Sequence, residues 1–175
     1  DKFIEQTKDV WTHLVDIRKS FEPRAEELAK KYALAPYTMF IGSGALWGET
    51  ILFSMCILEE MQWKRTRYIT SADFFHGTLE LVEPGVPVFL FMGEDENRKL
   101  DERVRAFLNR GVTGDTDINI IDTAEFAIPG LDDEFRVIVS PWILSSLITD
   151  RLAAYYETVT KHNLNYRRYY HQFDY

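Results

Sequence analysis

Short apolar runs alternate with helical segments along most of this chain of 175 residues. The runs are rich in β-branched and aromatic residues, a composition that favours buried strands. They cover residues 37–41, 67–70, 87–92 and 117–121. Strands that alternate with helices form parallel sheets, because a parallel pair of strands needs a crossover connection. The alternation therefore predicts an α/β fold with a mainly parallel sheet.

Helices are expected at both ends of the chain as well as between the strands. Residues 2–32 have helical spacing, and Pro23 predicts two helices or a break there. Residues 45–62 form a long helix that is apolar nearly all round, which indicates burial in a core or an interface. Residues 137–139 fit a short strand or a lead-in, after which Pro141 opens a helix that runs to about Lys161.

Composition limits the class of protein. The length fits one domain covering residues 1–175, and a hydrophobic content of 46% fits a globular chain. A net charge of −8 argues against nucleic acid as the main partner. No apolar run approaches the length of a membrane span, and no signal peptide is visible. The single cysteine, Cys56, lies in an apolar run, so we expect a buried thiol and a cytoplasmic protein.

Glu60 and His76 are the candidate proton carriers. Glu60 ends the apolar helix, and His76 follows the next strand sixteen residues later. We expect both at one edge of the sheet, where a carboxylate and an imidazole could transfer protons next to a carbonyl. The residues alone leave alternatives open: Glu59 and Glu60 could both be solvated at a helix end, and His76 could hold a turn together by hydrogen bonds. Neither periodicity nor composition chooses between Glu59 and Glu60.

A glycine-rich turn, Gly42-Ser43-Gly44, lies between a predicted strand and a predicted helix. Glycines there let a ligand approach the backbone, so Ser43 and Gly44 are candidate contacts for a sugar. The turn lacks the third glycine of a dinucleotide fingerprint and the lysine of a P-loop. It should meet His76-Gly77 and Gly93-Glu94 at the carboxyl edge of the sheet. The histidines show no spacing typical of metal ligands, so we expect no zinc site.

Taken together, several short motifs resemble the sugar isomerase (SIS) domain. They are Met61-Gln62-Trp63, Phe74-Phe75-His76-Gly77, and the tail Arg167-Arg168-Tyr169 that ends in Asp174-Tyr175. Within the family, the chain most resembles the bacterial fructosamine 6-phosphate deglycases, over nearly its whole length. The resemblance implies an SIS-type three-layer α/β/α sandwich that forms the C-terminal half of a protein with two SIS domains.

The family resemblance also implies a reaction and a site. Phosphorylated Amadori compounds such as fructoselysine 6-phosphate would be cleaved to glucose 6-phosphate and a free amine. His76 would assist ring opening, and Glu60, selected over Glu59 by the family's spacing, would move protons between C1 and C2. No metal or organic cofactor is implied. Family members can share one site between two subunits, so a homodimer or a higher homo-oligomer is expected.

Three departures from the family pattern qualify these expectations. The loop Gly93-Glu94-Asp95-Glu96 is acidic, so the phosphate grip is expected in the other SIS domain. Asp73 replaces the usual glutamate, and a family tail lysine corresponds to about His171. Two other functions use the same fold: an aldose–ketose sugar-phosphate isomerase, and a non-catalytic SIS domain that senses sugar phosphates.

Overall fold

A parallel four-stranded sheet forms the centre of the protein in a computed structural model, which describes residues 1–111, 114 and 116–174. The strands are β1 (Thr38–Ile41), β2 (Thr66–Ile69), β3 (Val88–Met92) and β4 (Ile118–Asp122). They lie in the order β2-β1-β3-β4, and every neighbouring pair is parallel. The prediction of an α/β fold with a parallel sheet is confirmed.

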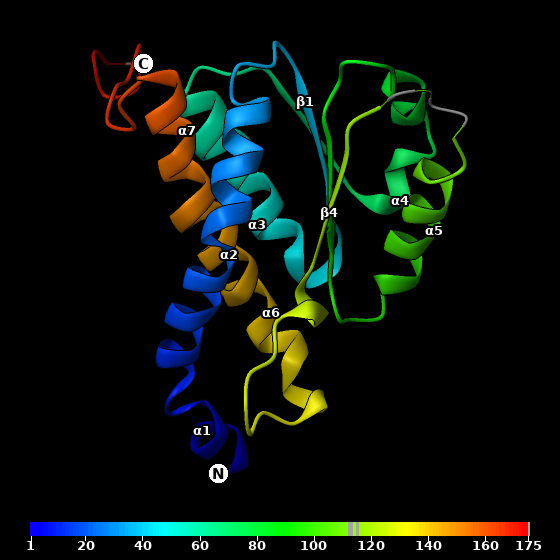
Figure 1. The fold of residues 1–175 in the computed structure, drawn as a ribbon, viewed down its shortest axis with the longest axis vertical. Coiled ribbons are helices and arrows are strands. Elements are labelled where there is room, and N and C mark those ends of the chain that lie inside the picture. Colours follow the sequence, from blue (N-terminus) through cyan, green and yellow to red (C-terminus); the bar gives the residue numbers. More distant parts are fainter. Residues whose placement is uncertain (112–113, 115, 175) are drawn as a thin grey trace.

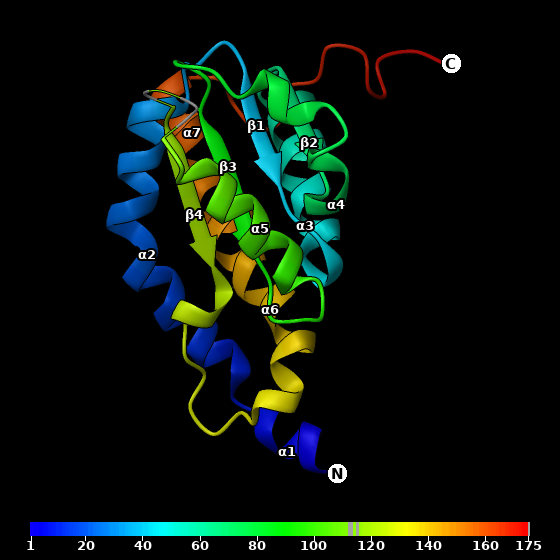
Figure 2. The same cartoon turned by 90° about the vertical axis from the view of Figure 1, so that its right-hand side faces the viewer.

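Helices cover both faces of the sheet and complete three layers (Figures 1 and 2). The longer ones are α2 (Val10–Tyr32), α5 (Arg98–Leu108), α6 (Asp133–Leu147) and α7 (Ala153–Thr160). Short α-helices are α1 (Lys2–Thr7), α3 (Trp47–Ile51) and α4 (Ser71–Phe74). Two π-helical stretches, η2 (Leu52–Met61) and η5 (Ile148–Leu152), continue α3 and α6. Single 3₁₀ turns are η1 (Gly44–Leu46), η3 (Thr78–Leu81) and η4 (Thr123–Glu125).

The core is divided by the sheet, because successive side chains of a strand point to opposite faces. Phe40, Phe89 and Phe91 face α2, η2, α6 and α7 in the larger cluster. Met39 and Leu90 face the other way, toward the layer of α4 and α5. Strands buried on both faces need apolar residues at every position, which explains why they read as continuous apolar runs.

Pro23 does not break the first long helix, contrary to the sequence prediction. It lies inside α2, which is continuous from Val10 to Tyr32, and the break instead falls at Lys8 and Asp9. The helix tolerates the proline because one side of α2 is fixed on the core by a row of buried side chains, including Phe21 and Ala25 on either side of it. Packing therefore outweighs the lost backbone hydrogen bond.

Residues 137–139 are helical, so the predicted short strand is wrong. They belong to α6, which begins at Asp133 and contains Pro141 in its interior. Proline cannot donate a hydrogen bond to the carbonyl four residues earlier. The carbonyl of Val137 instead accepts one from the Ser140 side chain at 3.3 Å. Val139 is fully buried in the core beneath α6. A buried valine fits a helix as well as a strand, so its apolar character does not distinguish the two.

The C-terminal helical stretch is long and apolar enough to pass the length and composition test for a membrane span, contrary to the expectation from the sequence. Residues Asp133–Thr160 include a window with a mean hydropathy of 1.3, enough by length and composition for a membrane span. Half of that window is buried inside the protein. A core helix that packs on a sheet has the same composition, so this feature is explained by the fold.

Candidate functional site

The turns after β1, β2 and β3 meet at the carboxyl edge of the sheet. Ser43 accepts a hydrogen bond from the Ser71 backbone N–H at 2.7 Å, and the Ser71 hydroxyl donates to Asp101 at 2.5 Å. Asp101 also accepts from the Gly93 N–H at 3.3 Å. The predicted meeting of the Ser43 and Gly93 turns is therefore present. Ser43 is buried, and its oxygen serves the protein itself.

Asp95 occupies the space in front of the glycine-rich turn. Its carboxylate accepts a hydrogen bond from the Ala45 N–H at 2.5 Å. Gly44 has a φ of +54°, and a Cβ atom there would collide with the Asp95 carboxylate. The helical N-terminus at Gly44, which could have bound the anionic group of a ligand, is thus already occupied by the carboxylate of Asp95. Gly44 lines a surface pocket whose charged residues are all acidic: Glu94, Asp95, Glu96, Asp133 and Glu134.

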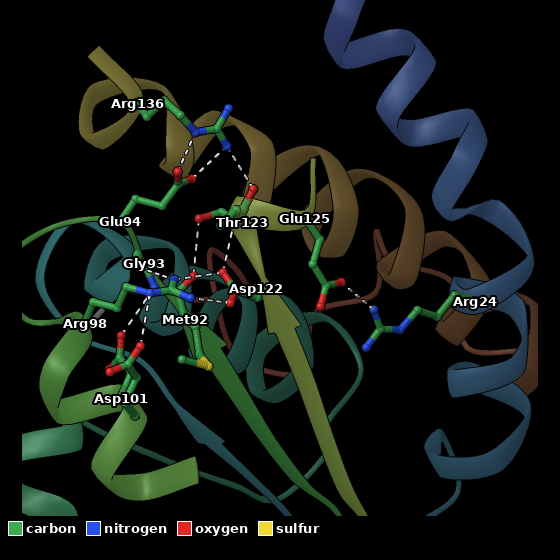
Figure 3. A network of polar contacts seen from close by, with 12 residues as sticks. Arg24, Met92, Gly93, Glu94, Arg98, Asp101, Asp122, Thr123, Glu125 and Arg136 are labelled. Carbon is green, nitrogen blue, oxygen red and sulfur yellow. Dashed lines mark hydrogen bonds and ion pairs between the residues drawn. The ribbon is translucent and has the colours of Figure 1, made fainter. Parts of the chain in front are cut away.

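Ion pairs hold two further acids at this edge, Asp122 and Glu94 (Figure 3). The guanidinium of Arg98 binds both oxygens of Asp122, at 2.9 and 2.6 Å, and also the Gly93 carbonyl at 2.8 Å. Arg136 binds Glu94 through two nitrogens. Burial raises the pKa of Asp101 to about 6. The carboxyl edge is therefore an internally satisfied acidic network, and it is a poor cradle for a phosphate.

His76 lies on the solvent side of the turn that follows α4. Its backbone N–H donates to the Asp73 carbonyl at 2.8 Å, and the side chain is exposed. Thr70 caps α4, because its hydroxyl oxygen accepts from the Asp73 N–H at 3.0 Å while its O–H donates to the Asp73 carboxylate at 2.8 Å. Phe74 buries α4 against the face of the sheet that α5 covers. His76 is thus carried by the layer of α4 and α5.

Glu60 lies on the opposite face of the sheet from His76, at the amino end of β2. It is the last residue but one of η2, which packs with α7 on the larger core and leads from the carboxyl end of β1 to the amino end of β2. The adjacent Glu59 accepts from the hydroxyl of Thr66, the first residue of β2, at 2.5 Å. The end of η2 therefore lies beside the amino end of β2. The expectation that Glu60 lies at the carboxyl edge is wrong, because the helix leads the chain back to the amino end of β2. Within one chain, Glu60 and His76 belong to layers on opposite faces of the sheet.

A pocket of about 470 Å³ opens beside Glu60. Arg167 Nε donates to Glu60 Oε1 at 2.8 Å, which brings the C-terminal tail to the end of η2. The pocket combines two acids with four cationic side chains and three aromatic rings. Its walls are Glu59, Glu60, Trp63, Lys64, Arg65 and residues 167–170. The basic aromatic tail is visible in the sequence, but no local pattern there connects it to Glu60.

Gln62 anchors the start of the tail. Its buried side chain donates to the His162 carbonyl at 2.6 Å and accepts from the Thr160 hydroxyl at 2.7 Å. Trp63, with a φ of 53°, places its ring edge-on to His162 at 4.3 Å between centroids. The Arg168 guanidinium lies 4.3 Å from the centre of the Trp63 ring. Residues 59–65 and the tail therefore form one unit.

The pocket can support proton transfer on an anionic ligand. Glu60 has a half-buried carboxylate whose orientation Arg167 holds, and cations around it attract negative charge. Within the described residues, no group of three histidine, cysteine, aspartate or glutamate side chains is placed to hold a metal ion. Proton transfer by side chains is the chemistry that these residues offer.

Comparison with known proteins gives consistent relatives, although no protein-family model matches the chain. It is 30% identical over 148 residues to the fructosamine deglycase FrlB of Bacillus subtilis, covering 83% of this chain and 43% of that protein. It is 29% identical over 170 residues to the fructoselysine 6-phosphate deglycase of Escherichia coli, covering 95% and 46%. Among solved structures, a candidate phosphosugar isomerase from Bacillus subtilis superposes with a TM-score of 0.89 at 27% identity, over 98% of this chain and 51% of that one. The chain thus spans about half the length of these relatives.

Proposed function

From the homology of this chain to the bacterial fructosamine deglycases and from its SIS fold, we propose that it carries the acid–base residue of a 6-phosphofructosamine deglycase. Its homologues are enzymes of the deglycase or phosphosugar isomerase kind. The observation that carries the proposal is the Glu60 carboxylate, held by Arg167 in a pocket with cationic walls. A general base needs a fixed position beside an open space for substrate, and Glu60 has both.

Glu60 transfers protons between two adjacent carbons of the open-chain sugar. The substrate is a ketosamine, with the amine nitrogen on C1 and a carbonyl at C2. The carboxylate removes a proton from C1, the C2 oxygen takes up a proton, and an enaminol forms. Glu60 then returns its proton to C2, which leaves an imine between C1 and nitrogen. Water adds to the imine carbon, and the amine leaves with glucose 6-phosphate as the other product.

His76 assists the ring opening that precedes proton transfer, and it comes from a second copy of the chain. Within one chain, His76 and Glu60 are carried by layers on opposite faces of the sheet. His76 is exposed and does not line the Glu60 pocket. A symmetric dimer that brings the α4 layer of one copy to the η2 end of the other would build two such sites. A homodimer with shared sites is therefore part of the proposal.

The sugar phosphate is held by another SIS domain of the whole protein. In this chain the turn that could cradle a phosphate is filled by Asp95 and surrounded by acids, so it would repel the dianion. This chain then supplies the acid–base half of the site, as the C-terminal SIS domain. Ser43 and Gly44 remain predicted sugar contacts. The Ser43 hydroxyl already bonds to Ser71, and Gly44 lies against Asp95, so we expect both to contact the sugar through their backbone atoms.

Amine release from fructoselysine 6-phosphate by the full-length protein tests the site. Glu60→Gln and His76→Ala should each abolish release while circular dichroism shows an intact fold. Glu59→Gln, which keeps a side-chain oxygen for Thr66, should lose far less activity. Full activity in either of the first two variants would contradict the assignment.

Mixing the two inactive variants tests the shared site. A mixed dimer of Glu60→Gln and His76→Ala subunits has one site with both intact residues and one with neither. After random exchange of subunits, about a quarter of the wild-type activity should return. If each site used residues of one chain only, the mixture would stay inactive.

An aldose–ketose isomerase is the second candidate function. It is favoured by the likeness to a candidate phosphosugar isomerase, and it would use the same proton transfer between C1 and C2. Turnover of fructoselysine 6-phosphate should be compared with turnover of glucosamine 6-phosphate and fructose 6-phosphate. A deglycase releases amine from the first compound and leaves the other two unchanged.

A further inference from the structure

Three of the four cations in the Glu60 pocket have no acidic partner among the residues that the structure describes. Arg167 is paired with Glu60, but no ion pair among residues 1–111, 114 and 116–174 involves Lys64, Arg65 or Arg168. The pocket therefore has an excess of positive charge although the protein carries a net charge of −8. A local excess of this sign concentrates anions in a pocket.

Arg168 is the best placed of the three cations. Its guanidinium lies 4.3 Å from the centre of the Trp63 ring, a cation–π contact that holds it at the wall of the pocket. Trp63 is itself held edge-on against His162. Within the described chain, no hydrogen bond from the Arg168 guanidinium is found, so its nitrogens remain free to donate to a planar two-oxygen anion.

The position of Glu60 indicates which anion the cations meet. On the proposed function, Glu60 acts on C1 and C2, and the amine nitrogen is attached to C1. The phosphate is on C6, at the far end of the sugar. In a substrate whose amino acid is linked to the sugar through its α-nitrogen, the carboxylate carbon is only two bonds from that nitrogen, on the side away from the sugar. A cation in the same pocket as Glu60 is thus better placed for the amine part than for the phosphate.

We propose that Arg168, supported by Trp63 and flanked by Lys64 and Arg65, binds the carboxylate of an amino acid that is linked to the sugar through its α-nitrogen, and so favours substrates of this kind. This subsite rests on the proposed function, and it names the substrate class of the same site. Desolvation lowers the pKa of Lys64, and a bound carboxylate would offset that loss of solvation. Arg168 acts in specificity, and Glu60 keeps the chemistry.

Binding of two unreactive analogues tests the subsite without turnover. Both are 1-amino-1-deoxyhexitol 6-phosphates: the glycine compound has a carboxymethyl group on the nitrogen, and the methylamine compound has a methyl group there and lacks the carboxylate. Calorimetry on the full-length wild type should show the glycine compound binding about ten-fold more tightly, as expected for one charge-assisted contact. Arg168→Gln should remove this preference and leave the methylamine compound within about two-fold of its wild-type affinity.

Lys161→Gln is the matched control, because Lys161 is an exposed cation near the tail that does not line the pocket. It should keep the full preference. Three results would overturn the subsite: no preference in the wild type, a preference that survives in Arg168→Gln, or equal weakening of both compounds, which would assign Arg168 to the phosphate. Failure of the proposed function alone would look different: both analogues would bind with the expected preference, but no amine would be released from 6-phosphofructosyl-glycine.

Discussion

Arg167 and Glu60 form an ion pair, with 2.8 Å between Nε and Oε1, that joins the C-terminal tail to the end of η2. Arg167 also donates to the carbonyls of Leu164 and Tyr166, at 2.8 and 2.9 Å. Its side chain is 19% exposed and that of Glu60 is 31% exposed, so solvent screens the pair only in part. The guanidinium is thus fixed from the tail side and sets the direction of the Glu60 carboxylate.

Removing the guanidinium should lower activity by misplacing Glu60. We expect Arg167→Ala to reduce kcat by about 10- to 100-fold, since a charge-assisted hydrogen bond contributes ~1.5–3 kcal/mol. KM should change less, because Arg167 positions a catalytic group and has no contact with the substrate in this scheme. Steady-state kinetics of amine release measures both constants.

Arg167→Lys separates charge from geometry. Lysine keeps the positive charge but cannot bind Glu60 and two carbonyls in one planar arrangement, so recovery should be partial. If Arg167→Ala instead raised KM alone, Arg167 would belong to substrate binding, and its positioning role would be wrong.

Loss of the Gln62 side chain should release the tail. Gln62→Ala leaves the His162 carbonyl and the Thr160 hydroxyl without this partner, which should cost about 1–3 kcal/mol in the free energy of unfolding. Denaturant unfolding measures this loss, and hydrogen exchange should become faster over residues 162–170. Gln172→Ala is the control, because Gln172 is exposed and should change stability little. Unchanged exchange in the tail of Gln62→Ala would contradict the anchoring role.

The sequence predicted the sheet well and the site only in part, for physical reasons. Apolar runs of strand length are a local signal, and the alternation with helices leaves few possible topologies. The contact between Glu60 and Arg167 joins residues far apart in the chain, and no periodicity encodes it. Glu60 was expected at the carboxyl edge, but a crossover helix runs back along the strands and ends at the amino end of β2. Pro141 does not mark the start of a helix here. A proline can begin a helix, but it can also lie inside one when the carbonyl that it leaves unpaired accepts a hydrogen bond from another donor.

Gly44 should not tolerate a side chain. Its φ of +54° disfavours other residues, and a Cβ would meet the Asp95 carboxylate and the Asn97 amide. We expect Gly44→Ala to lower the free energy of unfolding by about 1–3 kcal/mol. Gly48→Ala is the matched control: a Cβ at that helical position meets nothing within 4 Å, and alanine should stabilise by about 0.5–1 kcal/mol. Equal effects of the two substitutions in thermal or denaturant unfolding would contradict this account.

Asp101 should make stability depend on pH in the direction opposite to that of a salt-bridged acid. Burial raises its pKa to about 6, and the nearby Asp95 adds to the rise, whereas hydrogen bonds from Ser71 and Gly93 and the charge of Arg98 oppose it. An aspartate in the unfolded chain has a pKa of about 3.9. Between these values the folded state holds the proton more often than the unfolded state, so stability falls as pH rises.

The pH effect can be isolated by comparison with Asp101→Asn, which has no ionisable group at this position. The free energy of unfolding of the wild type minus that of the variant should be largest below about pH 4. It should decrease through pH 6, with a slope of at most ~1.4 kcal/mol per pH unit, and become constant above about pH 7. Urea unfolding at several pH values gives this difference directly, and other titrating groups cancel in the subtraction. A difference that increases with pH would mean that the folded state favours the ionised carboxylate, and the buried network at the carboxyl edge would then need another explanation.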